Sequence, residues 1–185
     1  VLDTGANRSV ISAAAVAELG LVPHAQVQVN VHGITGSASL PVVDVVSLAT
    51  FQATLNVGIQ AGFQLTQAVW PAMKTRGGAL VFVSSRSGVE GFADETAYCA
   101  AKHALEGFSK SLALEGAAHG ILSVTVTPGM YMHTPMSETT YSAELRAKWV
   151  DPIRLAPAFA YLATRPLHLS GQRLDAWALS QDHAS

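Results

Sequence analysis

A serine, a tyrosine and a lysine near the middle of the chain have the types and the spacing to move a proton. Ser85 follows the apolar run at 79–83, which predicts a short buried strand. Tyr98 and Lys102 lie four residues apart in a helical pattern, so we expect both side chains on one helix face. A phenol titrates near pH ~10, and a close ammonium favours the phenolate, which moves the tyrosine pKa toward neutrality. We therefore expect Tyr98 to exchange a proton with an alcohol or carbonyl group whose oxygen Ser85 hydrogen-bonds.

The same helix carries two further charges in line with Lys102. Glu106 and Lys110 follow it at successive i, i+4 positions, so Glu106 can pair with either lysine. We expect Lys110 to be a solvated surface charge, and only Lys102 to have a functional role.

The predicted elements place the serine at one edge of a parallel sheet. Apolar runs predict three strands, at 79–84, 121–127 and 172–178. Helical periodicity predicts two long helices, at 51–74 and 96–118. In an open α/β sheet, chemistry gathers at the carboxyl ends of the strands. The sequence therefore predicts an α/β fold: a partial Rossmann-like (doubly wound) parallel sheet with flanking helices, plus a small β-rich appendage at residues 1–50.

The three polar residues resemble the active site of the short-chain dehydrogenase/reductase family. In that family a serine lies about thirteen residues before a Tyr-x-x-x-Lys motif, which is the separation of Ser85 and Tyr98. The resemblance extends over about residues 51–180. It implies an NAD(P)-dependent oxidoreductase that transfers hydride to or from a small-molecule alcohol or carbonyl, with Ser85, Tyr98 and Lys102 as catalytic residues.

The resemblance also implies cofactor-binding residues and a partner. NAD or NADP would be bound by the tyrosine, the lysine, a turn beside the nicotinamide and a threonine after it: Tyr98, Lys102, Pro128, Gly129 and Thr134. The spacing from the turn to Thr134 is one residue longer than the usual family pattern. In the family, the helices that correspond to 51–74 and 96–118 pack against a second copy, which implies a homodimer.

Two departures from the family pattern bear on activity. The Gly-rich turn that holds the pyrophosphate in the family has no counterpart, because the stretch Gly33-Ile-Thr-Gly36 leads into Leu40-Pro41 and reads as a hairpin. Gly58 stands where the family has an asparagine that supports the proton relay through a water. We therefore predict that oxidoreductase activity is impaired in this chain.

The first fifty residues have a different pattern and resemble a truncated retropepsin-like aspartic protease. A hydrophobic pair precedes Asp-Thr-Gly-Ala at 3–6, and Gly33-Ile-Thr-Gly36 suits a hairpin flap. The resemblance implies a chimera, with a protease segment at 1–50 joined to a dehydrogenase half at 51–185. It also implies an alternative function, an aspartic protease that acts as a homodimer through Asp3. A non-catalytic fusion or remnant is the third hypothesis.

Composition argues against several classes of partner. Of the 185 residues 13% are charged, and the formal net charge of -2 gives no case for nucleic acid or an anionic membrane. One cysteine and seven histidines without ligand spacing argue against a metal site. No apolar run reaches the ~18 residues of a membrane span and no signal peptide is visible, so we expect a cytoplasmic protein.

Overall fold

The computed structural model describes residues 46–183, and these residues form a parallel sheet with helices on both faces. Three strands follow in the order β1-β2-β3: β1 Gly78–Val83, β2 Ile121–Thr127 and β3 Arg173–Asp175. The register pairs Val83 with Val126 and Thr127 with Asp175, so the carboxyl ends of the strands lie side by side. The predicted partial Rossmann-like sheet is confirmed. The predicted appendage at residues 1–50 falls almost entirely outside the described residues, as does Asp3.

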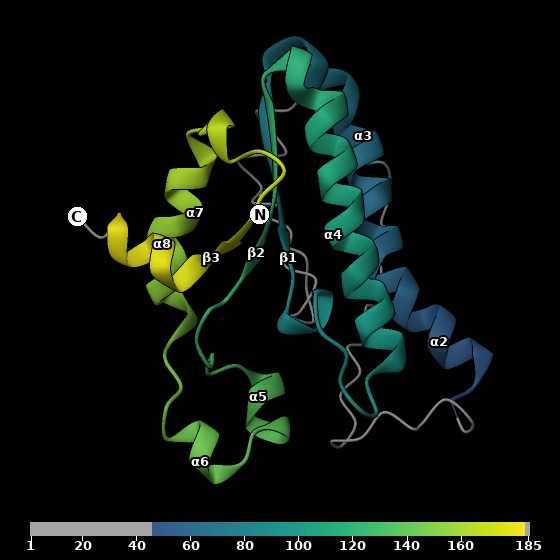
Figure 1. Ribbon diagram of the computed structural model, residues 1–185, viewed down its shortest axis with the longest axis vertical. Coiled ribbons are helices and arrows are strands. Elements are labelled where there is room, and N and C mark those ends of the chain that lie inside the picture. The colour runs from purple at the N-terminus through teal and green to yellow at the C-terminus, as the bar shows by residue number, and fades with distance from the viewer. Residues whose placement is uncertain (1–45, 184–185) are drawn as a thin grey trace, which may run out of the picture.

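The helices divide between the two faces of the sheet (Figure 1). One face is covered by α3 Ala61–Arg76 and α4 Thr96–Gly116, and α2 Leu48–Leu55 packs against α4. The other face is covered by α7 Ala156–Ala163 and α8 Ala176–Asp182. Two short helices, α5 Pro135–Thr140 and α6 Ala143–Arg146, lie beyond the carboxyl end of β2. Single turns of 3-10 helix occur at Arg86–Gly88, Ala117–His119, Pro152–Leu155 and Leu167–Leu169.

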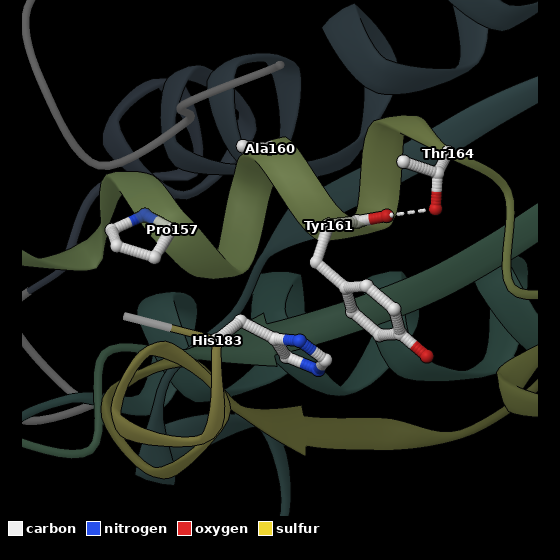
Figure 2. Close-up of a pocket in the computed structure, with 5 residues that line it drawn as sticks. All are labelled: Pro157, Ala160, Tyr161, Thr164 and His183. Atoms are coloured by element: carbon white, nitrogen blue, oxygen red, sulfur yellow. Dashed lines mark hydrogen bonds between the residues drawn. The ribbon is translucent and has the colours of Figure 1, made fainter. Parts of the chain in front are cut away.

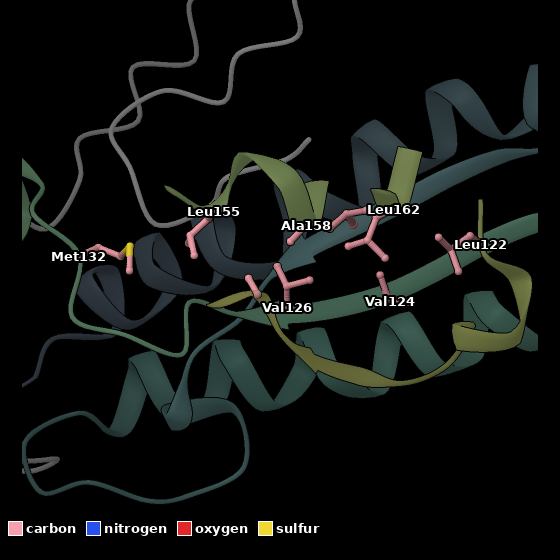
Figure 3. Packing of buried hydrophobic residues seen from close by; sticks show 9 residues of the cluster. Leu122, Val124, Val126, Met132, Leu155, Ala158 and Leu162 are labelled. Atoms are coloured by element: carbon pink, nitrogen blue, oxygen red, sulfur yellow. The ribbon is translucent and has the colours of Figure 1, made fainter. Parts of the chain in front are cut away.

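Alternate side chains of the strands belong to two separate hydrophobic cores, one on each face of the sheet. On the side of α7 and α8, Leu122, Val124 and Val126 of β2 pack against Ala158 and Leu162 (Figure 3). On the side of α3 and α4 the core consists of Met73, Leu80, Phe82, Leu105, Leu112 and Ile121. Burial of apolar side chains on both faces is what a doubly wound sheet requires, and it fixes the position of α4 against β1 and β2.

The helix predicted at 51–74 is longer and is interrupted by a π-helical turn at Asn56–Gln60. Ser47 begins it as an N-cap, its hydroxyl accepting a hydrogen bond of 3.0 Å from the Thr50 amide. Within the π turn Gly58 is buried, and a Cβ atom there would lie 2.5 Å from Cβ of Ala101 on α4. The absence of a side chain at Gly58 therefore permits close approach of this turn to α4.

The strand predicted at 172–178 is wrong beyond Asp175. Oδ1 of Asp175 accepts a hydrogen bond of 2.9 Å from the amide of Ala178 and so caps α8. An aspartate that satisfies an otherwise unpaired amide favours helix over continued strand, and residues 176–178 are helical for that reason. The short β3 keeps its pairing with Thr125, Val126 and Thr127 of β2.

Candidate active site

Ser85 lies directly after β1 and begins the turn that leads toward α4. Its backbone is extended, with φ -152° and ψ 169°, and its hydroxyl oxygen accepts a hydrogen bond of 3.2 Å from the Ser87 amide. The side chain is half-buried. The predicted position at the carboxyl end of a strand is therefore observed for Ser85.

Tyr98 and Lys102 lie on the first two turns of α4, and the ammonium connects this helix to β1. Lys102 is 2% exposed, and its Nζ donates a hydrogen bond of 2.9 Å to the carbonyl oxygen of Val83. The same Nζ lies 5.4 Å from the centre of the Tyr98 ring. The structure thus brings Tyr98 and Lys102 to the end of β1, and Ser85 follows that end by two residues.

A second connection joins the serine to the start of α4. The Ser85 hydroxyl lies 3.4 Å from that of Ser87, which donates a hydrogen bond of 2.8 Å to Oε2 of Glu95. Glu95 immediately precedes α4. The sequence analysis assigned no role to Ser87 or Glu95, because neither belongs to the serine, tyrosine and lysine pattern.

The Pro128-Gly129 turn follows β2 and contacts the end of β3. Gly129 has φ +75°, and a Cβ atom there would lie 2.0 Å from Oδ1 of Asp175. Thr134 lies farther along the chain and caps α5, its hydroxyl accepting a hydrogen bond of 3.2 Å from the Ser137 amide. The cofactor-binding roles of Pro128, Gly129 and Thr134 stay predictions.

Glu106 and Arg173 were also missed as members of this region. We expected Glu106 to pair with a lysine on its own helix, but the side chain is 6% exposed and is directed into the protein. Its carboxylate accepts hydrogen bonds from the hydroxyls of Ser84 (2.5 Å) and Thr125 (2.7 Å). The helical pattern contained the signal, because Glu106 lies one turn after Lys102 on the inward side of α4.

Two electrostatic effects occur in the loops around this edge. Arg86 and Glu90 form an exposed ion pair of 2.8 Å, and the hydrogen bond from Arg86 lowers the pKa of Glu90. Burial raises the pKa of Tyr141, and the neighbouring Tyr131 raises it further. The two tyrosine rings meet edge to face with centres 5.6 Å apart.

A shallow pocket of about 400 Å³ lies elsewhere, between α7 and the residue that follows α8 (Figure 2). The rings of Tyr161 and His183 stack there, 3.7 Å apart, and Pro157, Ala160 and Thr164 complete the lining. None of these residues belongs to the predicted site, whose Lys102 and Tyr98 lie beside the carboxyl end of β1.

Residues 46–183 contain neither a cluster of metal-ligating side chains nor a membrane-spanning helix. No group of three or more histidine, cysteine, aspartate or glutamate side chains that could hold a metal ion is found in this part of the chain. No helix in the same range combines the length and apolar character needed to cross a bilayer.

Two proteins similar to this chain are a reductase and a multifunctional enzyme by name. The acetoacetyl-CoA reductase of Allochromatium vinosum is 32% identical over 144 residues, which are 73% of this chain and 57% of that protein. The peroxisomal hydratase-dehydrogenase-epimerase of Saccharomyces cerevisiae is 36% identical over 124 residues, which are 66% of this chain and 14% of that protein. The chain therefore spans only part of the length of these relatives.

Solved structures share the fold. A blue fluorescent protein from a metagenomic library, solved with NADPH, has a TM-score of 0.65 and 27% identity over 77% of this chain and 62% of its own. Acetoin dehydrogenase from Enterobacter cloacae has a TM-score of 0.64 and 25% identity, over 78% of this chain and 62% of its own. The protease resemblance gains no support from these comparisons, so Asp3 and the segment boundary at residue 50 stay predictions.

The decisive comparison is with the sequence profile described as short chain dehydrogenase. It matches residues 6–145, which is well over half of the chain and includes the serine, the tyrosine and the lysine at the end of β1 and on α4. Fold, residue types and sequence profile agree, and the chain belongs to the short-chain dehydrogenase/reductase family.

Proposed function

We propose that Ser85, Tyr98 and Lys102 form the acid–base site of an NAD(P)-dependent oxidoreductase that acts on a small-molecule alcohol or carbonyl. The observation that carries this proposal is the hydrogen bond from Lys102 to the Val83 carbonyl, which holds a buried ammonium between Tyr98 and the strand that ends at Ser85. A buried cation beside a phenol stabilises the phenolate more strongly than it would in water.

Each residue then has one task in the reduction of a carbonyl. The Ser85 hydroxyl donates a hydrogen bond to the carbonyl oxygen and orients it. Tyr98 gives its phenolic proton to that oxygen as negative charge develops there, and Lys102 stabilises the phenolate that remains. NADH or NADPH supplies the hydride when bound. In alcohol oxidation the same groups act in reverse, with the Tyr98 phenolate accepting the proton.

The residues at this edge fit the nicotinamide end of the cofactor. Hydroxyl and ammonium donors lie at the end of β1, and the turn with Gly129 follows the end of the adjacent strand β2. Such donors suit ribose hydroxyls and a carboxamide. We assign this end to Tyr98, Lys102, Pro128, Gly129 and Thr134. The sequence lacks the family's Gly-rich pyrophosphate turn, so we expect the nucleotide to bind weakly and the activity to be impaired.

A homodimer and a cytoplasmic location complete the proposal. Helices α3 and α4 lie side by side (Figure 1) and expose Phe63 (48%) and Leu114 (82%) to solvent. Large apolar side chains on a helix pair favour burial against another protein surface. Sedimentation of the full chain and of Leu114→Glu tests the dimer. If the dimer forms through this surface, the substitution shifts the mass toward that of the monomer.

The enzymatic proposal is tested with the full 185-residue chain. The measurement is oxidation of NADH and of NADPH in the presence of acetoacetyl-CoA or acetoin, the substrate types in the names of two relatives. Tyr98→Phe removes the proposed acid, while Tyr161→Phe, in the pocket on α7, is the matched control. We expect slow turnover that Tyr98→Phe reduces by about 100-fold or more and Tyr161→Phe leaves unchanged.

Nucleotide binding separates the remaining hypotheses. Titration by fluorescence reports NADPH binding independently of turnover. If the chain neither binds NADPH at millimolar concentration nor shows turnover, the non-catalytic remnant is favoured and the proposal is overturned. Turnover that survives Tyr98→Phe would remove Tyr98 from the mechanism.

A further inference from the structure

A cluster of polar and charged side chains, buried except for the half-buried Arg173, joins α4 to all three strands. Its centre is the carboxylate of Glu106 on α4, which accepts hydrogen bonds from Ser84 at the end of β1 and from Thr125 on β2. Arg173, on β3, completes the cluster with its Nε 3.3 Å from Oε1 of Glu106, an ion-pair distance. One carboxylate therefore contacts a residue from or next to each strand of the sheet.

Arg173 extends this cluster to the proposed catalytic serine. Its Nη2 donates a hydrogen bond of 3.1 Å to the backbone carbonyl of Ser85. Nε of Arg173 makes no hydrogen bond, so the ion pair with Glu106 is what holds this side of the guanidinium. Because the group is planar, that ion pair also limits the directions in which Nη2 can point. The backbone of Ser85 is thus held from β3 by a side chain that α4 orients.

A cluster of this kind is not needed for stability alone. Burying charged groups carries a desolvation cost, and apolar side chains of similar volume commonly stabilise a core as well or better. Glu106 lies one turn after Lys102, on the helix that carries Tyr98. The ion pair therefore connects the two elements whose relative position the proposed reaction depends on.

We propose that Glu106 and Arg173 are positioning residues, which hold the Ser85 backbone in register with Tyr98 and Lys102. The inference rests on the proposed oxidoreductase function and deepens it. Neither residue needs to touch the substrate. Holding reacting groups within a fraction of an ångström matters because a displacement of ~1 Å can lower a rate by about 100-fold.

Three variants of the full chain test the role of Arg173. Arg173→Met keeps the length of the side chain but removes the hydrogen bond to Ser85. Arg173→Lys keeps the charge beside Glu106 without the planar fork. Arg165→Met is the matched control, because Arg165 also donates to a distant backbone carbonyl, that of Arg76, 3.1 Å away, but next to the start of β1 and not its end.

Steady-state kinetics gives the first result. With acetoacetyl-CoA and NADPH, we expect Arg173→Met to lower kcat by about 100-fold with an unchanged KM for NADPH, and Arg173→Lys to recover part of the loss. Arg165→Met should leave both constants unchanged. A general loss of folded protein would instead lower the active fraction, which thermal unfolding of each variant reports. An unchanged kcat in folded Arg173→Met overturns the inference.

Amide hydrogen exchange gives a second result that needs no turnover. We expect the amides of residues 85–88 to exchange at least about tenfold faster in Arg173→Met and in Glu106→Gln than in the native chain, while those of α3 do not change. If the native chain shows no turnover, the proposed function fails, yet this measurement still decides the positioning role. Should Arg173→Met not fold, Arg173→Lys and Glu106→Gln decide it in the same way, and equal exchange in the native chain and the folded variants overturns it.

Discussion

The Lys102 ammonium donates a hydrogen bond of 2.9 Å to the carbonyl oxygen of Val83, and this contact joins α4 to the end of β1. Lys102 is buried, so the bond compensates part of the cost of removing the cation from water. The carbonyl belongs to the strand that Ser85 follows, and the cation also faces the ring of Tyr98. One side chain therefore sets the distance between the strand and the helix of the proposed site.

Replacing this lysine should affect activity far more than folding. In Lys102→Met the proposed phenolate loses its counter-charge, and we expect kcat to fall by about 100- to 10,000-fold. The Val83 carbonyl loses a partner, which should lower the free energy of unfolding by about 1–3 kcal/mol, measured in urea. Lys110→Met is the matched control on the exposed side of α4 and should stay within about 0.5 kcal/mol of the native chain. Equal kcat for both variants would contradict the assigned role.

The positions of the three proposed site residues in the fold could be predicted because each depends on a short-range pattern. Ser85 follows a strand that its apolar run reveals, and Tyr98 and Lys102 share a helix face by their spacing alone. The inward position of Glu106 follows from its spacing to Lys102, but its partner could not be predicted. Its partner Arg173 comes from a strand far along the chain, and only the packing of β3 beside β2 brings the two charges together.

The errors at the end of the sheet have a similar cause. Alternation from Gln172 to Trp177 favours a strand, whereas the Asp175 carboxylate caps a helix. Local periodicity does not decide between these two outcomes, because the helix gains burial of Ala176 and Ser180 that no pattern reveals. The π turn at 56–60 was likewise unpredictable, since it depends on contact with α4.

Gly58 should tolerate no side chain while Ala101 is opposite. A Cβ atom at Gly58 would lie 2.5 Å from Cβ of Ala101, so Gly58→Ala must separate the π turn from α4. We expect the free energy of unfolding in urea to fall by about 1–3 kcal/mol, although alanine is the better helix former. Gly58→Asn, which restores the family residue, should be at least as destabilising.

The opposing residue provides the control for this prediction. Ala101→Gly removes the Cβ atom that Gly58→Ala would meet. The double variant Gly58→Ala/Ala101→Gly should therefore be more stable than the sum of the single changes, by about 1 kcal/mol or more. If the two single changes in the free energy of unfolding simply add up in the double variant, the contact between Gly58 and Ala101 does not limit how closely the π turn and α4 pack.

Stability at alkaline pH should depend on Tyr141. Burial raises the pKa of this phenol above its ordinary value, so the folded chain holds the proton at a pH where the unfolded chain releases it. The stability that results is fully present below pH ~10 and is lost as pH rises through the folded pKa. We expect the free energy of unfolding of the native chain to fall more steeply above pH ~10 than that of Tyr141→Phe. Parallel curves for the two proteins would exclude this contribution.

Gly129 should be sensitive to substitution for two separable reasons. Its φ of +75° is costly for any residue with a Cβ atom, and a Cβ atom would also lie 2.0 Å from Oδ1 of Asp175. The first effect alone amounts to about 1–2 kcal/mol. Displacing Asp175 adds a second cost, because this carboxylate caps α8, and loss of a cap costs about 0.5–2 kcal/mol.

Gly120 separates the two effects on Gly129, because its φ is +63° and nothing lies within 4 Å of the position that a Cβ atom would occupy. Gly120→Ala should therefore show the backbone cost alone. We expect Gly129→Ala to lower the free energy of unfolding in urea by about 1 kcal/mol more than Gly120→Ala does. The excess should disappear when both glycine variants are compared in an Asp175→Ala background, since the opposing carboxylate is then absent. Equal costs in the native background would mean that Asp175 moves aside freely and does not hold the turn after β2.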